Sequence, residues 1–91
     1  MLLDSITTSG DYTARQNLAD VSIYVCNPTA YTAYVTISWI SGDGRLTGVL
    51  YSEYPILANN SEKLLSSLNI ERKDIIRVAS TVAGVKFTLM Q

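Results

Sequence analysis

No histidine and only one cysteine, Cys26, occur among the 91 residues of this chain. A single thiol cannot form an internal disulfide, which fits synthesis in a reducing cytoplasm. It also cannot supply the ligands of a zinc site, and the usual base for a serine or cysteine nucleophile is missing. Cys26 lies on the strand face opposite that of Val25. We expect it to be a buried side chain that fills space and not a nucleophile. We therefore predict neither an enzyme nor a bound cofactor or metal.

Charge is scarce as well. Charged residues make up 16% of the chain, and the formal net charge is −1. The basic residues form no stripe, so nucleic acid is not an expected partner. The acidic residues fall in predicted turns or at predicted exposed strand positions, where we expect solvated charges. Asp20 and Asp74 each begin a strand, where a carboxylate commonly accepts hydrogen bonds from turn amides.

Long apolar runs are also missing. Met1–Leu3 is too short for the apolar core of a signal peptide, and Asp4 ends it. Neither secretion nor membrane insertion is therefore expected.

What the chain does contain is strict alternation. In Asp20–Cys26 and Tyr31–Ile40 apolar residues occupy every second position, which places each apolar set on one face of a sheet. The turn Asn27–Ala30 between them predicts a hairpin. The Asp43-Gly44 pair is a strong turn signal before the next strand. Further strands are predicted over Gly48–Tyr54, Asp74–Ser80 and Val85–Met90.

Residues 61–68 fit two structures. Leu64, Leu65 and Leu68 match one face of a short helix capped by Asn60 or Ser61. The same residues match a strand through Leu64 followed by one helical turn. The all-β surroundings favour the strand, and strand plus turn is our prediction.

About six short strands separated by turn residues predict an all-β fold, a small antiparallel β-sandwich or jelly-roll-like domain. We assign residues 16–91 to this domain and residues 1–15 to a short N-terminal arm or edge strand. Trp39 and Phe87 are the largest inward-facing candidates, and we expect them to meet in the core.

The positive signals favour an interaction role. The hydrophobic fraction is 47%, and six tyrosines stand against one phenylalanine. Tyrosine is enriched at interfaces because one end of its side chain stays wet. The predicted partner-binding residues are Leu2, Leu3, Ile6, Tyr12, Tyr31, Tyr34, Tyr51 and Tyr54.

The C-terminal half resembles small β-sandwich virion proteins of tailed bacteriophages. The likeness is carried by Tyr51–Leu64, Leu68–Thr81 and Val85–Leu89, which contain the Asp-x-Ile-x-Val-x-Ala-Ser and Val-x-Phe-x-Leu strands. Val25–Asn27 followed by Ala33–Ile37 is similar too, so that the likeness covers roughly Ala19–Met90, most of the chain. One departure is Arg72-Lys73, where such sequences often carry a small residue or glycine before the aspartate.

This resemblance implies a capsid decoration (cement) protein that binds the outer surface of the phage head and stabilises the shell. It implies two kinds of partner. One is further copies of the chain, which would form a homotrimer, and the other is the major capsid protein. It also implies a place on the virion surface after synthesis in the host bacterial cytoplasm. Two alternatives remain open: a tail, collar or fibre-associated structural component, and a carbohydrate- or host-binding module whose sugar platform would be Tyr31, Tyr34, Tyr51 and Tyr54.

Overall fold

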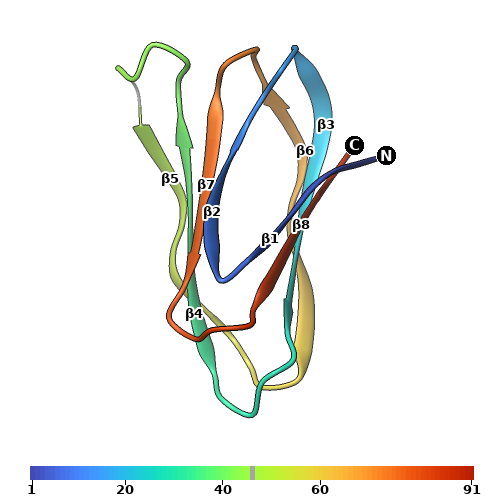
Figure 1. The fold of residues 1–91 in the computed structure, drawn as a ribbon, viewed down its shortest axis with the longest axis vertical. Coiled ribbons are helices and arrows are strands. Elements are labelled where there is room, and N and C mark those ends of the chain that lie inside the picture. The colour runs from blue at the N-terminus through green and yellow to red at the C-terminus, as the bar shows by residue number, and fades with distance from the viewer. Residues whose placement is uncertain (46) are drawn as a thin grey trace.

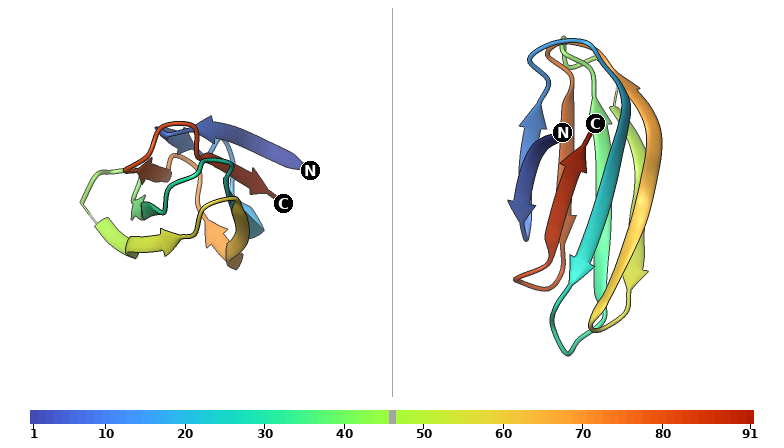
Figure 2. Two further views of the ribbon diagram at one scale, coloured as in Figure 1. Left: turned by 90° about the horizontal axis from the view of Figure 1, so that it is seen from below. Right: turned by 90° about the vertical axis from the view of Figure 1, so that its right-hand side faces the viewer.

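The computed structural model describes every residue of the chain except Leu46, and these residues form eight strands and no helix. No described segment could cross a membrane as a helix. Two four-stranded antiparallel sheets face each other, as Figures 1 and 2 show. The predicted all-β sandwich is confirmed. The strands are β1 (Leu2–Thr7), β2 (Ser9–Thr13), β3 (Leu18–Asn27), β4 (Ala33–Ile40), β5 (Thr47–Ile56), β6 (Asn60–Ile70), β7 (Ile75–Ser80) and β8 (Lys86–Met90).

The strand order identifies the type of sandwich. One sheet has the order β1-β8-β3-β6 and the other has β2-β7-β4-β5. The antiparallel pairs β4–β5, β3–β6, β2–β7 and β1–β8 are nested in the sequence, so the chain forms one long hairpin. Rolling this hairpin places successive pairs in alternate sheets. The result is an eight-stranded jelly roll, and residues 1–15 supply two of its four edge strands, β1 and β2.

The predicted hairpin between β3 and β4 is wrong. The two strands lie in different sheets: β3 pairs with β6 and β8, and β4 pairs with β5 and β7. Their apolar faces therefore oppose each other across the core instead of lying side by side. Alternation alone cannot distinguish these arrangements, because each places one apolar face inward. The strand pair around Asp43-Gly44, β4–β5, is a hairpin as predicted.

The core contains aliphatic residues from both sheets and one fully buried aromatic ring, Phe87. Phe87 pairs with Ile6 on β1 and Val25 on β3. Trp39 is only half-buried; it packs against the core at another level, beside Ile76. Of the two rings expected to meet in the core, only Phe87 is fully buried, and Trp39 lies partly buried at the margin of the core.

Two further predictions need correction. Residues 61–68 belong to one continuous strand, β6, with no helical turn, and its alternation is broken by irregular pairing with β3. Ser67 has a left-handed φ of 58° at this irregularity. Cys26 is exposed and not buried, because it lies on the outer face of its sheet, where Tyr24 is also exposed.

Candidate interaction surfaces

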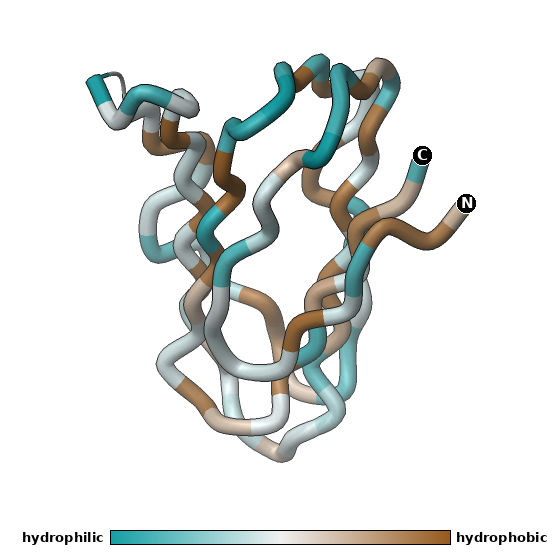
Figure 3. Tube along the Cα trace, turned by 45° about the horizontal axis from the view of Figure 1, so that its top comes forward, coloured by the Kyte–Doolittle hydropathy of each residue, from teal (hydrophilic) through white to brown (hydrophobic). Residues whose placement is uncertain are grey.

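The two ends of the sandwich differ in charge. Four connections meet at one end: Thr8 and residues 28–32, 57–59 and 81–85. None of these residues is charged. The connections at the opposite end, residues 14–17, 41–45 and 71–74, contain both acidic and basic residues, and hydrophilic segments gather there at the top of Figure 3. We call these the uncharged end and the charged end.

Two large apolar side chains are exposed at the uncharged end. Tyr31 is 72% exposed and Leu57 is 59% exposed. Tyr34 is 47% exposed on the adjoining sheet face, next to Pro55 on β5. Solvent-exposed apolar side chains grouped on an uncharged surface are typical of interaction sites.

A buried asparagine fixes this end. The Asn27 side chain is fully buried, and its Nδ2 donates to the carbonyl oxygens of Tyr31 at 2.7 Å and Ile56 at 3.0 Å. Its Oδ1 accepts from the Thr29 hydroxyl at 2.6 Å and the Thr29 amide at 3.1 Å. A further contact of 3.3 Å reaches the Leu57 carbonyl. Asn27 therefore holds together the two connections that carry Tyr31 and Leu57.

At the charged end, Asp74 has the corresponding structural role. It is 4% exposed, and its carboxylate accepts hydrogen bonds from Trp39 Nε1 at 3.0 Å, the Gly42 amide at 3.0 Å and the Glu71 amide at 2.9 Å. The expectation that Asp74 accepts from turn amides is confirmed, whereas the expectation that all carboxylates are solvated is wrong for it. The three hydrogen bonds that the carboxylate accepts compensate for the cost of removing it from water.

Asp20 does not repeat this arrangement. It is exposed with a left-handed φ of 57°, and its amide donates to Asn69 Oδ1 at 3.2 Å.

Tyr51 and Tyr54 close one side of the sandwich. The sequence places them on opposite faces of β5, but an irregularity between them, with Glu53 at a φ of 50°, turns both toward the core. Their rings meet edge to face with centroids 5.1 Å apart. Tyr51 donates to the Leu64 carbonyl at 2.6 Å, and Tyr54 donates to Glu62 Oε1 at 3.1 Å. The hydrogen bond to Glu62 raises the pKa of Tyr54.

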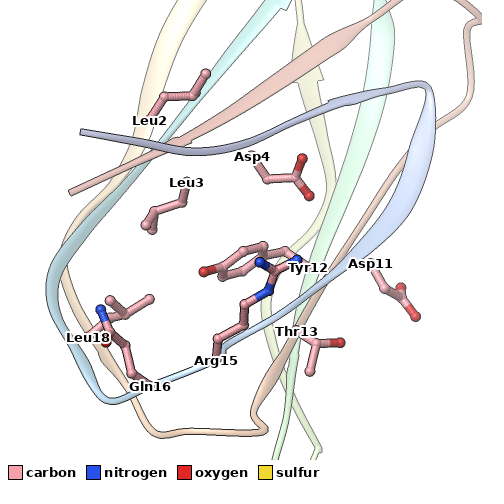
Figure 4. Close-up of a pocket in the computed structure, with 9 residues that line it drawn as sticks. All are labelled: Leu2, Leu3, Asp4, Asp11, Tyr12, Thr13, Arg15, Gln16 and Leu18. Atoms are coloured by element: carbon pink, nitrogen blue, oxygen red, sulfur yellow. The ribbon is translucent and has the colours of Figure 1, made fainter.

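On the other side, a cleft of about 680 Å³ opens between β1 and β2 (Figure 4). The two strands meet at Thr8 and diverge from there, so that Leu3, Tyr12 and Leu18 line the opening together with Arg15. Near the junction the strands approach closely. A Cβ on Gly10 would lie 2.9 Å from Ile6 Cγ2.

The structure thus separates the predicted partner-binding residues. Leu2, Tyr31 and Tyr34 are exposed, and Leu2 lies beside Met90 on one sheet face. Ile6 is buried, and the other four pack partly buried against the core: Leu3, Tyr12, Tyr51 and Tyr54. Sequence analysis missed Leu57 and Asn27; the Asn-Pro pair at the end of a strong strand was the available signal for the latter.

The outer face of the β2-β7-β4-β5 sheet carries one ion pair. Arg77 donates from Nε and Nη2 to the two carboxylate oxygens of Asp11, at 2.9 and 3.0 Å. These hydrogen bonds lower the pKa of Asp11 and raise that of Arg77. Among the described residues, no group of three or more acidic, cysteine or histidine side chains could hold a metal ion.

Comparison with known proteins identifies no family. No protein-family model matches the chain, and no curated protein matches it at a significant level. Among solved structures, the chain is similar to part of one chain in "Structure of infectious bursal disease virus Gt strain". The match has 14% identity and a TM-score of 0.43, and it covers 94% of this chain and 26% of the viral chain. A likeness of this size carries no conclusion about function.

Proposed function

We propose that this protein is a structural component of a tailed-phage virion that decorates the outside of the head. The sequence resemblance motivates this proposal. The fold is compatible with it, because jelly rolls occur in viral capsid domains, but they also occur in lectins and cupins, so fold alone does not select a function.

The observation that supports docking is the uncharged end. The buried Asn27 donates to the backbone carbonyls of Tyr31 and Leu57, and so holds the backbone that carries these two exposed apolar side chains. A surface that is already ordered loses little conformational entropy on binding. In this proposal the end packs against an uncharged area of the major capsid protein, and many copies together raise the energy needed to separate shell subunits.

The first measurement is the copy number of the chain in purified particles, relative to the major shell protein. A ratio near one, or a simple fraction of it, supports decoration. A handful of copies would place the chain in the tail, collar or fibre. Absence from particles would contradict a virion role and favour the binding-module alternative. The four-tyrosine platform of that alternative does not form, because Tyr51 and Tyr54 face the core.

A variant tests which surface docks. Tyr31→Asp places a carboxylate on the uncharged end without disturbing the core, since Tyr31 is 72% exposed. Burying that unpaired charge should weaken binding to particles that lack the chain by at least about tenfold. Arg72→Asp is the matched control at the charged end, because Arg72 is also exposed. Equal binding by wild type and Tyr31→Asp would exclude the uncharged end as the docking surface.

A further inference from the structure

Each sheet of the sandwich has two edge strands, and three of the four are irregular. The pairing of β1 shifts register between Leu2 and Asp4, and that of β6 shifts at several points. β5 contains Pro55 and register shifts of its own. Such features protect sheet edges from pairing with other chains. β2 has none of them: it pairs with β7 in unbroken register from Ser9 to Thr13.

The hydrogen bonds at the ends of β2 show which of its groups are free. The Ser80 amide donates to the Thr8 carbonyl, and the Ala14 amide donates to the Asp74 carbonyl, both at 2.8 Å. In an antiparallel pair, alternate residues bond to the same neighbour. Gly10 and Tyr12 therefore bond to β7, and the intervening residues direct their amides and carbonyls toward the open edge. These residues are Ser9, Asp11 and Thr13.

We propose that two copies of this chain pair antiparallel through β2, about a twofold axis at Asp11, and join two sheets into one continuous sheet. Ser9 then exchanges both backbone hydrogen bonds with Thr13 of the second copy, and the two Asp11 residues exchange theirs with each other. Gly10 stands opposite Tyr12 of the second copy. The strand is self-complementary in this register, because the residue without a side chain faces the largest one.

Charge does not oppose this pairing. Like charges directly opposite each other destabilise a strand pair, and the axis brings two Asp11 carboxylates together. Each carboxylate is already bound through both oxygens by its own Arg77. The two Asp11 carboxylates and the two Arg77 guanidinium groups together carry no net charge. Each guanidinium also has further N–H donors for the carboxylate of the second copy.

The cleft between β1 and β2 opens along the same edge. A second copy at β2 covers that opening and removes part of Leu3 and Tyr12 from water. The backbone edge and the apolar opening beside it therefore favour one occupant, another copy of the same edge. An extended segment of a different protein would satisfy the backbone groups, but it would not explain the Gly10–Tyr12 match.

The test is the molar mass of the purified full chain by light scattering over a concentration series. We expect a dimer, and not the trimer that the sequence resemblance implies. Thr13→Pro removes an amide directed to the open edge and no hydrogen bond to β7, and proline is tolerated at such a position of an edge strand. It should weaken dimerisation by at least about tenfold, since each dimer loses two donors. Thr13→Val keeps the amide and should dimerise as wild type does.

A wild-type monomer at all concentrations, a trimer, or an unchanged dimer with Thr13→Pro would overturn the proposal. If Thr13→Pro fails to fold, amide hydrogen exchange of the wild type decides. The amides of Ser9, Asp11 and Thr13 should be protected at high concentration and exchange rapidly on dilution; no dependence on concentration would refute pairing through β2. Pairing is measured without particles, so its failure and a failure of docking are separate results.

Discussion

Asn27→Ala should be among the most damaging single substitutions of a polar residue in this protein. Four hydrogen bonds of 2.6–3.1 Å connect the Asn27 side chain to Tyr31, Ile56 and Thr29. Each is worth about 1 kcal/mol net, and a buried carbonyl left without a donor costs about 1–3 kcal/mol. Since Ile56 is fully buried, we expect a loss of about 3–5 kcal/mol in the free energy of unfolding.

That loss is large for a domain whose total stability is about 5–15 kcal/mol. Urea denaturation followed by tryptophan fluorescence measures it, and an unchanged m-value shows that the two proteins unfold from comparable states. In thermal unfolding, each kcal/mol corresponds to about 4–8 °C for a chain of this size. Asn69→Ala is the matched control. It removes one exposed contact of 3.2 Å, to the Asp20 amide, and should cost less than about 1 kcal/mol.

Asn27→Asp tests the hydrogen-bond donors of the Asn27 side chain separately from its acceptor. It keeps the acceptor for Thr29 but removes both donors and places a carboxylate against the carbonyls of Tyr31 and Ile56. It should be at least as unstable as Asn27→Ala at neutral pH and recover partly on acidification, because a protonated carboxyl donates one hydrogen bond. An Asn27→Ala loss no larger than that of Asn69→Ala would refute the argument that Asn27 holds this end together.

Two further predictions concern the sides of the sandwich. Because the pKa of Tyr54 is raised by its hydrogen bond to Glu62, the stability that this bond contributes is fully present below the unfolded-state pKa of about 10 and is lost as the pH rises through the folded-state value. The deficit of Tyr54→Phe relative to wild type should therefore shrink in alkaline melts; a constant deficit would contradict the assignment. Gly10→Ala should cost about 1–3 kcal/mol, because the new Cβ would lie 2.9 Å from Ile6 Cγ2. Ile6→Ala should cost less in the Gly10→Ala background than alone, and strict additivity in this double-mutant cycle would exclude the clash.

Alternation in the sequence predicts the strands well because every strand of this fold has one face in water and one in the core. It does not predict which strands share a sheet. β3 and β4 have the pattern of a hairpin, yet they lie on opposite sides of the core. The choice depends on long-range pairing with β8 and β7, whose patterns would fit either partner.

Local backbone irregularities caused two further errors. At a β-bulge one strand contains an extra residue, often with positive φ, and the side chains that follow change faces relative to strict alternation. Glu53 has this effect between Tyr51 and Tyr54, so two residues predicted on opposite faces both reach the core. Ser67 does the same in β6. As a result Leu64, Leu65 and Leu68 have the spacing expected for one face of a helix, although they lie in a strand. Neither residue is glycine, so the sequence gives no signal of the left-handed conformation.

The two proposed surfaces impose a geometry on each other. Antiparallel pairing through β2 points the uncharged ends of the two copies in opposite directions, and each copy is 37 Å along its longest axis. If the dimer lies along the shell, its two uncharged ends are at opposite extremes, so that each would contact a different subunit and the dimer would form a bridge. Binding of the second end is then intramolecular and raises the overall affinity by about 10²–10⁴ when the spacing fits. Thr13→Pro, which leaves the uncharged end intact, should consequently still dock, but with this gain lost, whereas Tyr31→Asp should weaken each end separately. If Thr13→Pro binds particles as tightly as the wild type, the two surfaces act independently and the bridge does not exist.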